Sequence, residues 1–188
     1  LFGILVQHAA LESLSLTDVA ISGVDSGPGH DATLEYLRVS RVDPYGDGHE
    51  TWTSLALRGP VAGRLLAKVL PRVPEAAMLD IREVTITSEE FPFESVPLGL
   101  RWVTIADARV SESFLRALSR QTTLESLRLS KVTIRSVDLT DPALGGFSSV
   151  RSMELADVMI DGIALTDPAL EPLVMRLHDQ LPETSISI

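Results

Sequence analysis

An apolar pattern that recurs about every 24 residues is the feature that most restricts how this chain can fold. Each copy reads apolar-x-x-apolar-x-apolar, and most copies continue x-x-Val or x-x-Ala. The copies begin at Leu11, Leu34, Trp52, Ala76, Leu100, Leu124 and Val150, and a truncated copy begins at Glu183. A recurring interval of this size indicates a repeat array in which each copy stacks on the next.

The fourth and sixth positions of each copy are the apolar pair that we expect to form the core. Side chains alternate along a strand, so these two positions share one face, as Leu127 and Leu129 do in the copy that begins at Leu124. One strand per copy stacks into a parallel sheet whose inward column is buried by its neighbours. The pattern predicts an α/β solenoid of about eight repeats, with a curved parallel sheet on the concave side and helices and loops on the convex side.

Three return segments carry helix signals. Apolar residues line one face of 61–70, and Pro71 ends that segment. Ser111 is a suitable N-cap for a helix that begins with Glu112. Asp167 is a second cap, and Pro168 suits the first helical position. The segments 43–50 and 88–97 are predicted to be loops.

The repeat phrase is similar to the leucine-rich-repeat consensus L-x-x-L-x-L. Residues 110–129, VSESFLRALSRQTTLESLRL, resemble the helix-then-strand repeats of ribonuclease-inhibitor type, which also form the C-terminal arms of NOD-like receptors. The resemblance covers nearly the whole chain. It implies a single leucine-rich-repeat domain over 1–188 that works in innate immunity by binding another protein. The apolar start of the sequence has no initiator Met and no basic n-region, so we expect the domain to be cut from a longer chain.

One position departs from that family. The family usually places Asn three residues after the last strand leucine, where its side chain bonds backbone groups in a ladder. Here the position holds Val19, Val42, Pro60, Val84, Ala108, Val132 and Val158. We therefore expect no such ladder, turn amides that use water or other partners, and a divergent, irregular array.

Composition excludes several classes of function. The formal charge is −10, so the surface as a whole repels nucleic acids and anionic membranes. No run of about 18 apolar residues is present, so no membrane-spanning helix is expected. The chain has no cysteine, which excludes thiol chemistry and disulfide caps and favours a cytoplasmic location.

The concave face is the predicted binding surface, formed by the third, fifth and seventh positions of each copy. Most of these residues are small or polar. Large or charged side chains interrupt them, and aromatic residues and Arg dominate interface hot spots. The candidate partner-binding residues are Tyr36, Arg38, Met78, Asp80, Trp102 and Arg128.

Catalysis has little support in the sequence. His8 and His178 fall on predicted convex segments, and no nucleophile elbow, phosphate-binding loop or His-Glu-x-x-His motif occurs. The segments around 25–31 and 43–50 are rich in Asp, Glu and His, but their spacing fits neither a calcium loop nor a zinc site. We predict no catalytic residue, no metal and no cofactor.

The last strand is a candidate for self-association. Ile186 and Ile188 are expected to face inward in the strand 184–188. Its open edge lacks the Pro or Lys that usually protects an edge, so antiparallel pairing about a two-fold axis is predicted to give a homodimer.

The function predicted from sequence is protein–protein recognition, as the C-terminal sensing or autoinhibitory arm of a cytosolic NOD-like receptor, and not enzymatic. One alternative is a standalone scaffold or a GTPase-regulator-like adaptor. The other is a metal-dependent hydrolase built on the 25–50 segments.

A substitution in the inward column tests the register. Leu127→Ala is expected to lower the free energy of unfolding by about 2–5 kcal/mol, because it removes a buried side chain and leaves a cavity. Chemical denaturation measures this change. An unchanged denaturation curve would show that the predicted inward positions are wrong.

Overall fold

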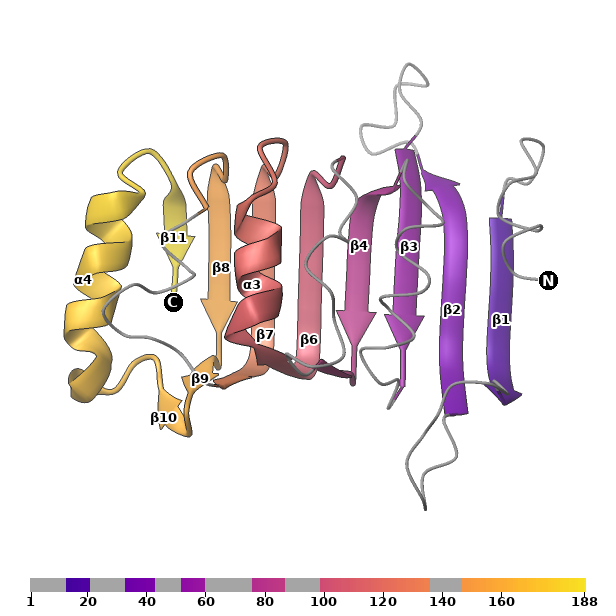
Figure 1. Ribbon diagram of the computed structural model, residues 1–188, viewed down its shortest axis with the longest axis horizontal. Helices are drawn as coiled ribbons and strands as arrows, with labels where there is room; N and C mark the ends of the chain where they lie inside the picture. The colour runs from indigo at the N-terminus through magenta and orange to yellow at the C-terminus, as the bar shows by residue number, and fades with distance from the viewer. Residues whose placement is uncertain (1–12, 21–32, 43–51, 60–75, 87–98, 136–146) are drawn as a thin grey trace.

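The structure, a computed structural model, describes residues 13–20, 33–42, 52–59, 76–86, 99–135 and 147–188. A strand lies at each of the eight predicted repeat starts, and these strands form one sheet in the order β1-β2-β3-β4-β6-β7-β8-β11 (Figure 1). Their bounds are β1 Ser13–Ala20, β2 Thr33–Val42, β3 Trp52–Arg58, β4 Ala76–Arg82, β6 Trp102–Ser111, β7 Ser126–Arg135, β8 Ser152–Ala156 and β11 Ser185–Ser187.

From β3 onward, neighbouring strands of this sheet are parallel, as predicted. The prediction of a wholly parallel sheet is wrong for the first three strands, because β2 runs antiparallel to both β1 and β3. A parallel connection needs a dozen or more residues to return along the strand. Only 43–51 separate β2 from β3, which matches the shortest interval between repeat starts, from Leu34 to Trp52.

The inward column is buried as the repeat pattern predicts. Leu127 and Leu129 are both 0% exposed, which confirms their register. The same two positions are buried in the neighbouring strands: Leu55 and Leu57, Leu79 and Ile81, Val103 and Ile105, Met153 and Leu155. These residues belong to one continuous hydrophobic cluster, as expected for repeats that bury each other's faces.

The five repeats that contain β3, β4, β6, β7 and β8 turn a corner at a residue with positive φ, one position before the Val, Ala or Pro of the repeat pattern. The corner residues are Gly59, Glu83, Asp107, Lys131 and Asp157, with φ between 49° and 116°. At the corner the buried positions shift by one residue: in β6, Val103 and Ile105 are buried before it, and Ala108 and Val110 after it. This extra residue explains why two residues, and not one, separate the last strand apolar position from the Val or Ala position. Its effect on the strand is that of a β-bulge.

Beyond the corner, a second short strand segment continues the repeats that contain β4, β6, β7 and β8. β5, Thr85–Ile86, pairs with the end of β6, which pairs with the end of β7. β9, Met159–Ile160, pairs with β7 and then with β10, Ile163–Ala164. β10 is antiparallel to β9, and the turn between them is Asp161-Gly162, with positive φ at both residues. Such a turn matches the right-handed twist of a two-residue hairpin.

The corner amides find partners in the neighbouring repeat. The Gly59 N–H donates to the Arg82 carbonyl oxygen at 3.2 Å, and the Glu83 N–H donates to that of Ala106 at 3.0 Å. Side-chain hydroxyls add cross-repeat bonds before the strands, such as Thr123 Oγ1 to the Leu100 oxygen at 2.9 Å. The expected loss of the Asn ladder is therefore compensated by direct contacts between repeats.

Helices cover one face of the sheet at its C-terminal end (Figure 1). The α3 helix, Glu112–Ser119, begins as predicted: the Ser111 hydroxyl accepts from the Phe114 N–H. The 3₁₀ helix η4, Pro168–Leu170, is capped by Asp167 and leads into α4, Glu171–Gln180. The predicted helix at 61–70 and the predicted loops at 43–50 and 88–97 lie outside the described residues. None of the helices described is long and apolar enough to cross a membrane.

The corner conformation can be tested at Lys131, where φ is 53°. Lys131→Val is expected to lower stability by about 1–2 kcal/mol, because a β-branched side chain is strained at positive φ. Lys131→Gly is the matched control and should keep or raise stability. Thermal denaturation compares the two variants, and equal losses would point to the lost side chain and not to the backbone.

Candidate functional site

Three rows of side chains cross the outward face of the main sheet, on the side opposite to the buried column. The strand register places Met78 beside Trp102, and Trp102 beside Ser126. Small polar residues fill the rest of this first row: Ser40, Ser54, Ser126, Ser152 and Ser185. Met78 and Trp102 are both partly exposed, so a large apolar contact area lies in the middle of a polar row.

The second row carries charge. The register aligns Arg38, Ala56, Asp80, Thr104, Arg128, Glu154 and Ser187. Arg128 Nη2 lies 3.1 Å from Glu154 Oε1 on the next strand. The predicted residues Asp80 and Arg128 thus lie in the same row, with Thr104 between them.

Asp80 forms a bidentate ion pair with Arg82 on the same strand. Arg82 donates from Nε and Nη2 to the two Asp80 carboxylate oxygens, each at 3.0 Å. The hydrogen bond to Asp80 raises the pKa of Arg82, and the negative charge of the Asp80 carboxylate raises it further. The bidentate geometry fixes both side chains in one orientation, which gives this part of the face a defined charge pattern.

The structure brings together four of the six predicted binding residues in neighbouring rows: Met78, Asp80, Trp102 and Arg128. Tyr36 does not share a row with Met78 and Trp102, as the repeat alignment implied. β2 runs antiparallel, so Tyr36 pairs with Arg58 at the other end of β3. Arg38 keeps its row because it pairs with Ala56, near the middle of the strand.

Asp80 and Glu154, two carboxylates of the charged row, lie too far apart to act together as an acid and a base. Asp80 on β4 and Glu154 on β8 are separated by β6 and β7, which places them roughly 14 Å apart at the usual strand spacing. Within the described ranges, no group of three His, Asp or Glu side chains is arranged to hold a metal ion. The acidic segments at 25–31 and 43–50 lie outside those ranges, and His178 is exposed on α4.

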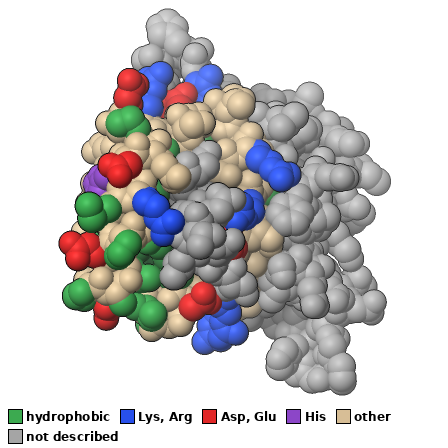
Figure 2. Space-filling view, turned by 60° about the vertical axis from the view of Figure 1, so that its left-hand side comes forward, with side chains coloured by type: hydrophobic (Ala, Val, Ile, Leu, Met, Phe, Trp, Pro, Cys, Tyr) green, Lys and Arg blue, Asp and Glu red, His purple; other side chains and the backbone are tan. Residues whose placement is uncertain are grey.

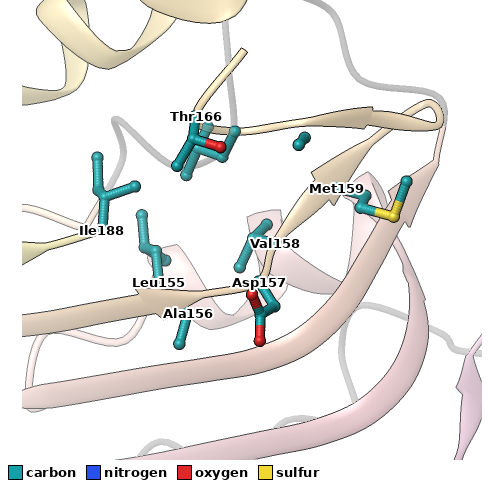
Figure 3. Close-up of a pocket in the computed structure, with 9 residues that line it drawn as sticks. Leu155, Ala156, Asp157, Val158, Met159, Thr166 and Ile188 are labelled. Atoms are coloured by element: carbon teal, nitrogen blue, oxygen red, sulfur yellow. The ribbon is translucent and has the colours of Figure 1, made fainter.

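An apolar cavity at the C-terminal end of the sheet was not predicted from the sequence. It has a volume of about 500 Å³ and lies among β8, β9, β10 and the end of the chain (Figure 3). Its lining includes Leu155, Val158, Met159, Leu165 and Ile188. Ile188, which was expected to face inward, lines this cavity beside the inward residue Leu155 and is 44% exposed.

Acidic and hydrophobic side chains share the surface at this end of the molecule (Figure 2). The exposed large hydrophobic residues in the described part of the chain are Met159, Ile163, Met175 and Ile188. Two of these, Met159 and Ile188, line the cavity. The sequence signal for the cavity is the Asp161-Gly162 turn, which ends the regular repeat path.

Comparison with known families finds no match, and comparison with curated proteins finds none either. Among solved structures, one that is similar is an internalin from Listeria monocytogenes, at 16% identity and a TM-score of 0.36. The aligned region covers 66% of this chain and 36% of that one, so it spans about a third of the internalin. A similarity at this level does not establish a family.

The Arg128–Glu154 ion pair is expected to contribute little to stability. The two side chains are 56% and 41% exposed, and exposed pairs contribute about 1 kcal/mol or less. Arg128→Ala should therefore lower the free energy of unfolding by about 1 kcal/mol or less, as measured by chemical denaturation. A larger shift would mean that Arg128 also supports the packing of the sheet.

Proposed function

We propose that this chain is a protein-recognition module whose partner docks on the outward face of the main sheet. The observation that carries the proposal is the adjacent pair Met78 and Trp102, both partly exposed in a row of serines. A Trp beside a flexible Met offers a large apolar contact with few side-chain rotors, which is typical of an interface anchor.

The second row, which carries charged side chains next to Met78 and Trp102, supports selective recognition of one partner. Asp80 and Arg128 flank Thr104 on three neighbouring strands, and each is held in an ion pair, Asp80 with Arg82 and Arg128 with Glu154. A docked segment therefore meets two oriented ion pairs at fixed spacing. Charges around an apolar anchor contribute more to orientation and to the choice of partner than to affinity. Arg38 extends the same row toward the N-terminal end.

The architecture also supports binding over catalysis. One strand per repeat presents an extended surface, which repeat proteins commonly use to bind other macromolecules. We propose further that the module is the sensing arm of a cytosolic receptor of the NOD-like class, and this rests on fold analogy alone. A nucleotide-binding domain encoded upstream in the same reading frame would support the receptor, whereas its absence would favour a standalone scaffold.

Replacement of the anchor tests the docking surface. Trp102→Ala is expected to abolish capture of a partner from cell lysate, because the main apolar contact is lost. Met175→Ala is the matched control, since Met175 is 60% exposed on α4 and far along the chain from this row. Circular dichroism checks that both variants fold. Equal capture by the wild type and Trp102→Ala would refute the proposed surface.

A further inference from the structure

The charges of the outward face have opposite signs on the two sides of β6. In the second row, Asp80 lies one strand before Thr104, and Arg128 lies one strand after it. The corner residues of the same two repeats repeat this pattern, since Glu83 follows β4 and Lys131 lies within β7. At both positions, therefore, the β4 repeat carries an acid and the β7 repeat carries a cation.

Trp102 lies on the strand between these two repeats, in the row next to Thr104. A two-fold axis parallel to β6 and above these two residues exchanges β4 with β7 of a second copy and keeps the strand direction. Trp102 then faces its own copy, and Asp80 faces Arg128 of the second copy. By the same exchange, the acid at the corner of β4 faces the cation at the corner of β7. Sheets that pack face to face commonly keep their strands aligned in this way.

From β3 to β8, the remaining charges of the rows meet no like charge across this axis. The third row aligns Arg58, Arg82, Ala106, Ser130 and Ala156. Across the axis, Arg82 faces Ser130 of the second copy. Arg58 faces Ala156 in the same way. In the second row, Glu154 faces Ala56.

Two charged residues at the ends of β6 lie near the axis and therefore near their own copies. Each has an opposite charge on the next repeat: Arg101 Nη1 lies 3.6 Å from Glu125 Oε1, and Lys131 Nζ lies 4.0 Å from Asp107 Oδ1. These partners offset the repulsion between the like charges, which also lie in contact with water.

The outward face lacks the excess negative charge of the chain. From β3 to β8 the three rows hold three arginines and two acids, a net charge of +1, whereas the chain as a whole carries −10. A second copy is therefore not repelled by this face. A strongly charged partner of either sign finds little net charge here to attract it.

We propose that a second copy of this chain docks on the outward face and forms an isologous dimer about a two-fold axis parallel to β6. The inference rests on the proposed function, because it names the partner of that same surface. Trp102 and its copy provide the apolar contact. Each new pair of Asp80 with Arg128 joins the Asp80–Arg82 ion pair of one copy to the Arg128–Glu154 pair of the other, so charges of alternating sign cross the interface.

Charge reversal tests this arrangement with the whole 188-residue chain. In sedimentation analysis, Asp80→Arg and Arg128→Asp should each weaken the wild-type dimer at least about tenfold, because like charges then meet at two places. A mixture of the two variants should form a dimer again, because each altered position meets an opposite charge on the other chain. Circular dichroism checks that both variants fold.

The matched control is Arg135→Asp, which makes the same charge change at an exposed residue at the end of β7, beyond the corner. It should leave the dissociation constant of the dimer within about twofold of the wild-type value, because a charge outside the interface is screened by salt.

A cross-link locates the axis. The chain has no cysteine, so one introduced cysteine gives a single reactive site. Thr104→Cys lies on the axis, and a thiol-specific linker of roughly 10 Å, the spacing of packed sheets, should join it to its own copy. Ser54→Cys lies two strands from the axis, so four strand spacings, roughly 19 Å, separate it from its copy, and the same linker should not join them.

Three outcomes would overturn the inference. One is a wild-type chain that is monomeric at about 0.1 mM, where a dimer of micromolar affinity is largely formed. Another is a mixture of the two charge variants that stays monomeric. The third is a dimer that neither charge variant weakens, which would move the interface elsewhere, for example to the predicted strand 184–188. A monomer would not refute the proposed function, because capture of a different protein from lysate, and its loss in Trp102→Ala, tests that proposal separately.

Discussion

The positive-φ corner in the five repeats from β3 to β8 is the constraint on which the rest of the structure depends. Two buried strand segments must follow each other around the core, and regular alternation would turn the second segment's apolar side chains outward. One extra residue at the corner restores them to the inside, as Ile81 and Val84 show on either side of Glu83. The backbone hydrogen bond from the Glu83 N–H to the Ala106 oxygen then ties this corner to the neighbouring repeat.

The outward rows follow from the same constraint. Because every corner from β3 to β8 occurs at the same register, residues such as Met78, Trp102 and Ser126 are aligned across strands. Their side chains contribute little to the core, so this face can differ from repeat to repeat without loss of the fold. The variation in side-chain size and charge along the outward rows is therefore informative about binding. The inward column is uniformly apolar because its side chains must pack in the core.

Much of this architecture could be predicted because its causes are local. The apolar spacing placed Leu127 and Leu129 in the core, and Ser111 and Asp167 were recognised as helix caps. The direction of β2 was missed, because a repeat alignment assumes that every copy runs the same way. That assumption also put Tyr36 in the wrong row. The Asp161-Gly162 dipeptide is a sequence signal for the hairpin of β9 and β10, but the cavity itself was not predicted, since its lining depends on how β10 folds back against β9.

The position of the Trp102 row bears on how the module can evolve. The row lies in the middle of the array, where neighbours on both sides hold its strand. Side chains that are three strands away lie roughly 14 Å from it, and substitutions at that distance usually act independently. Outward residues at one end of the sheet can therefore change while the contact that Trp102 offers is kept.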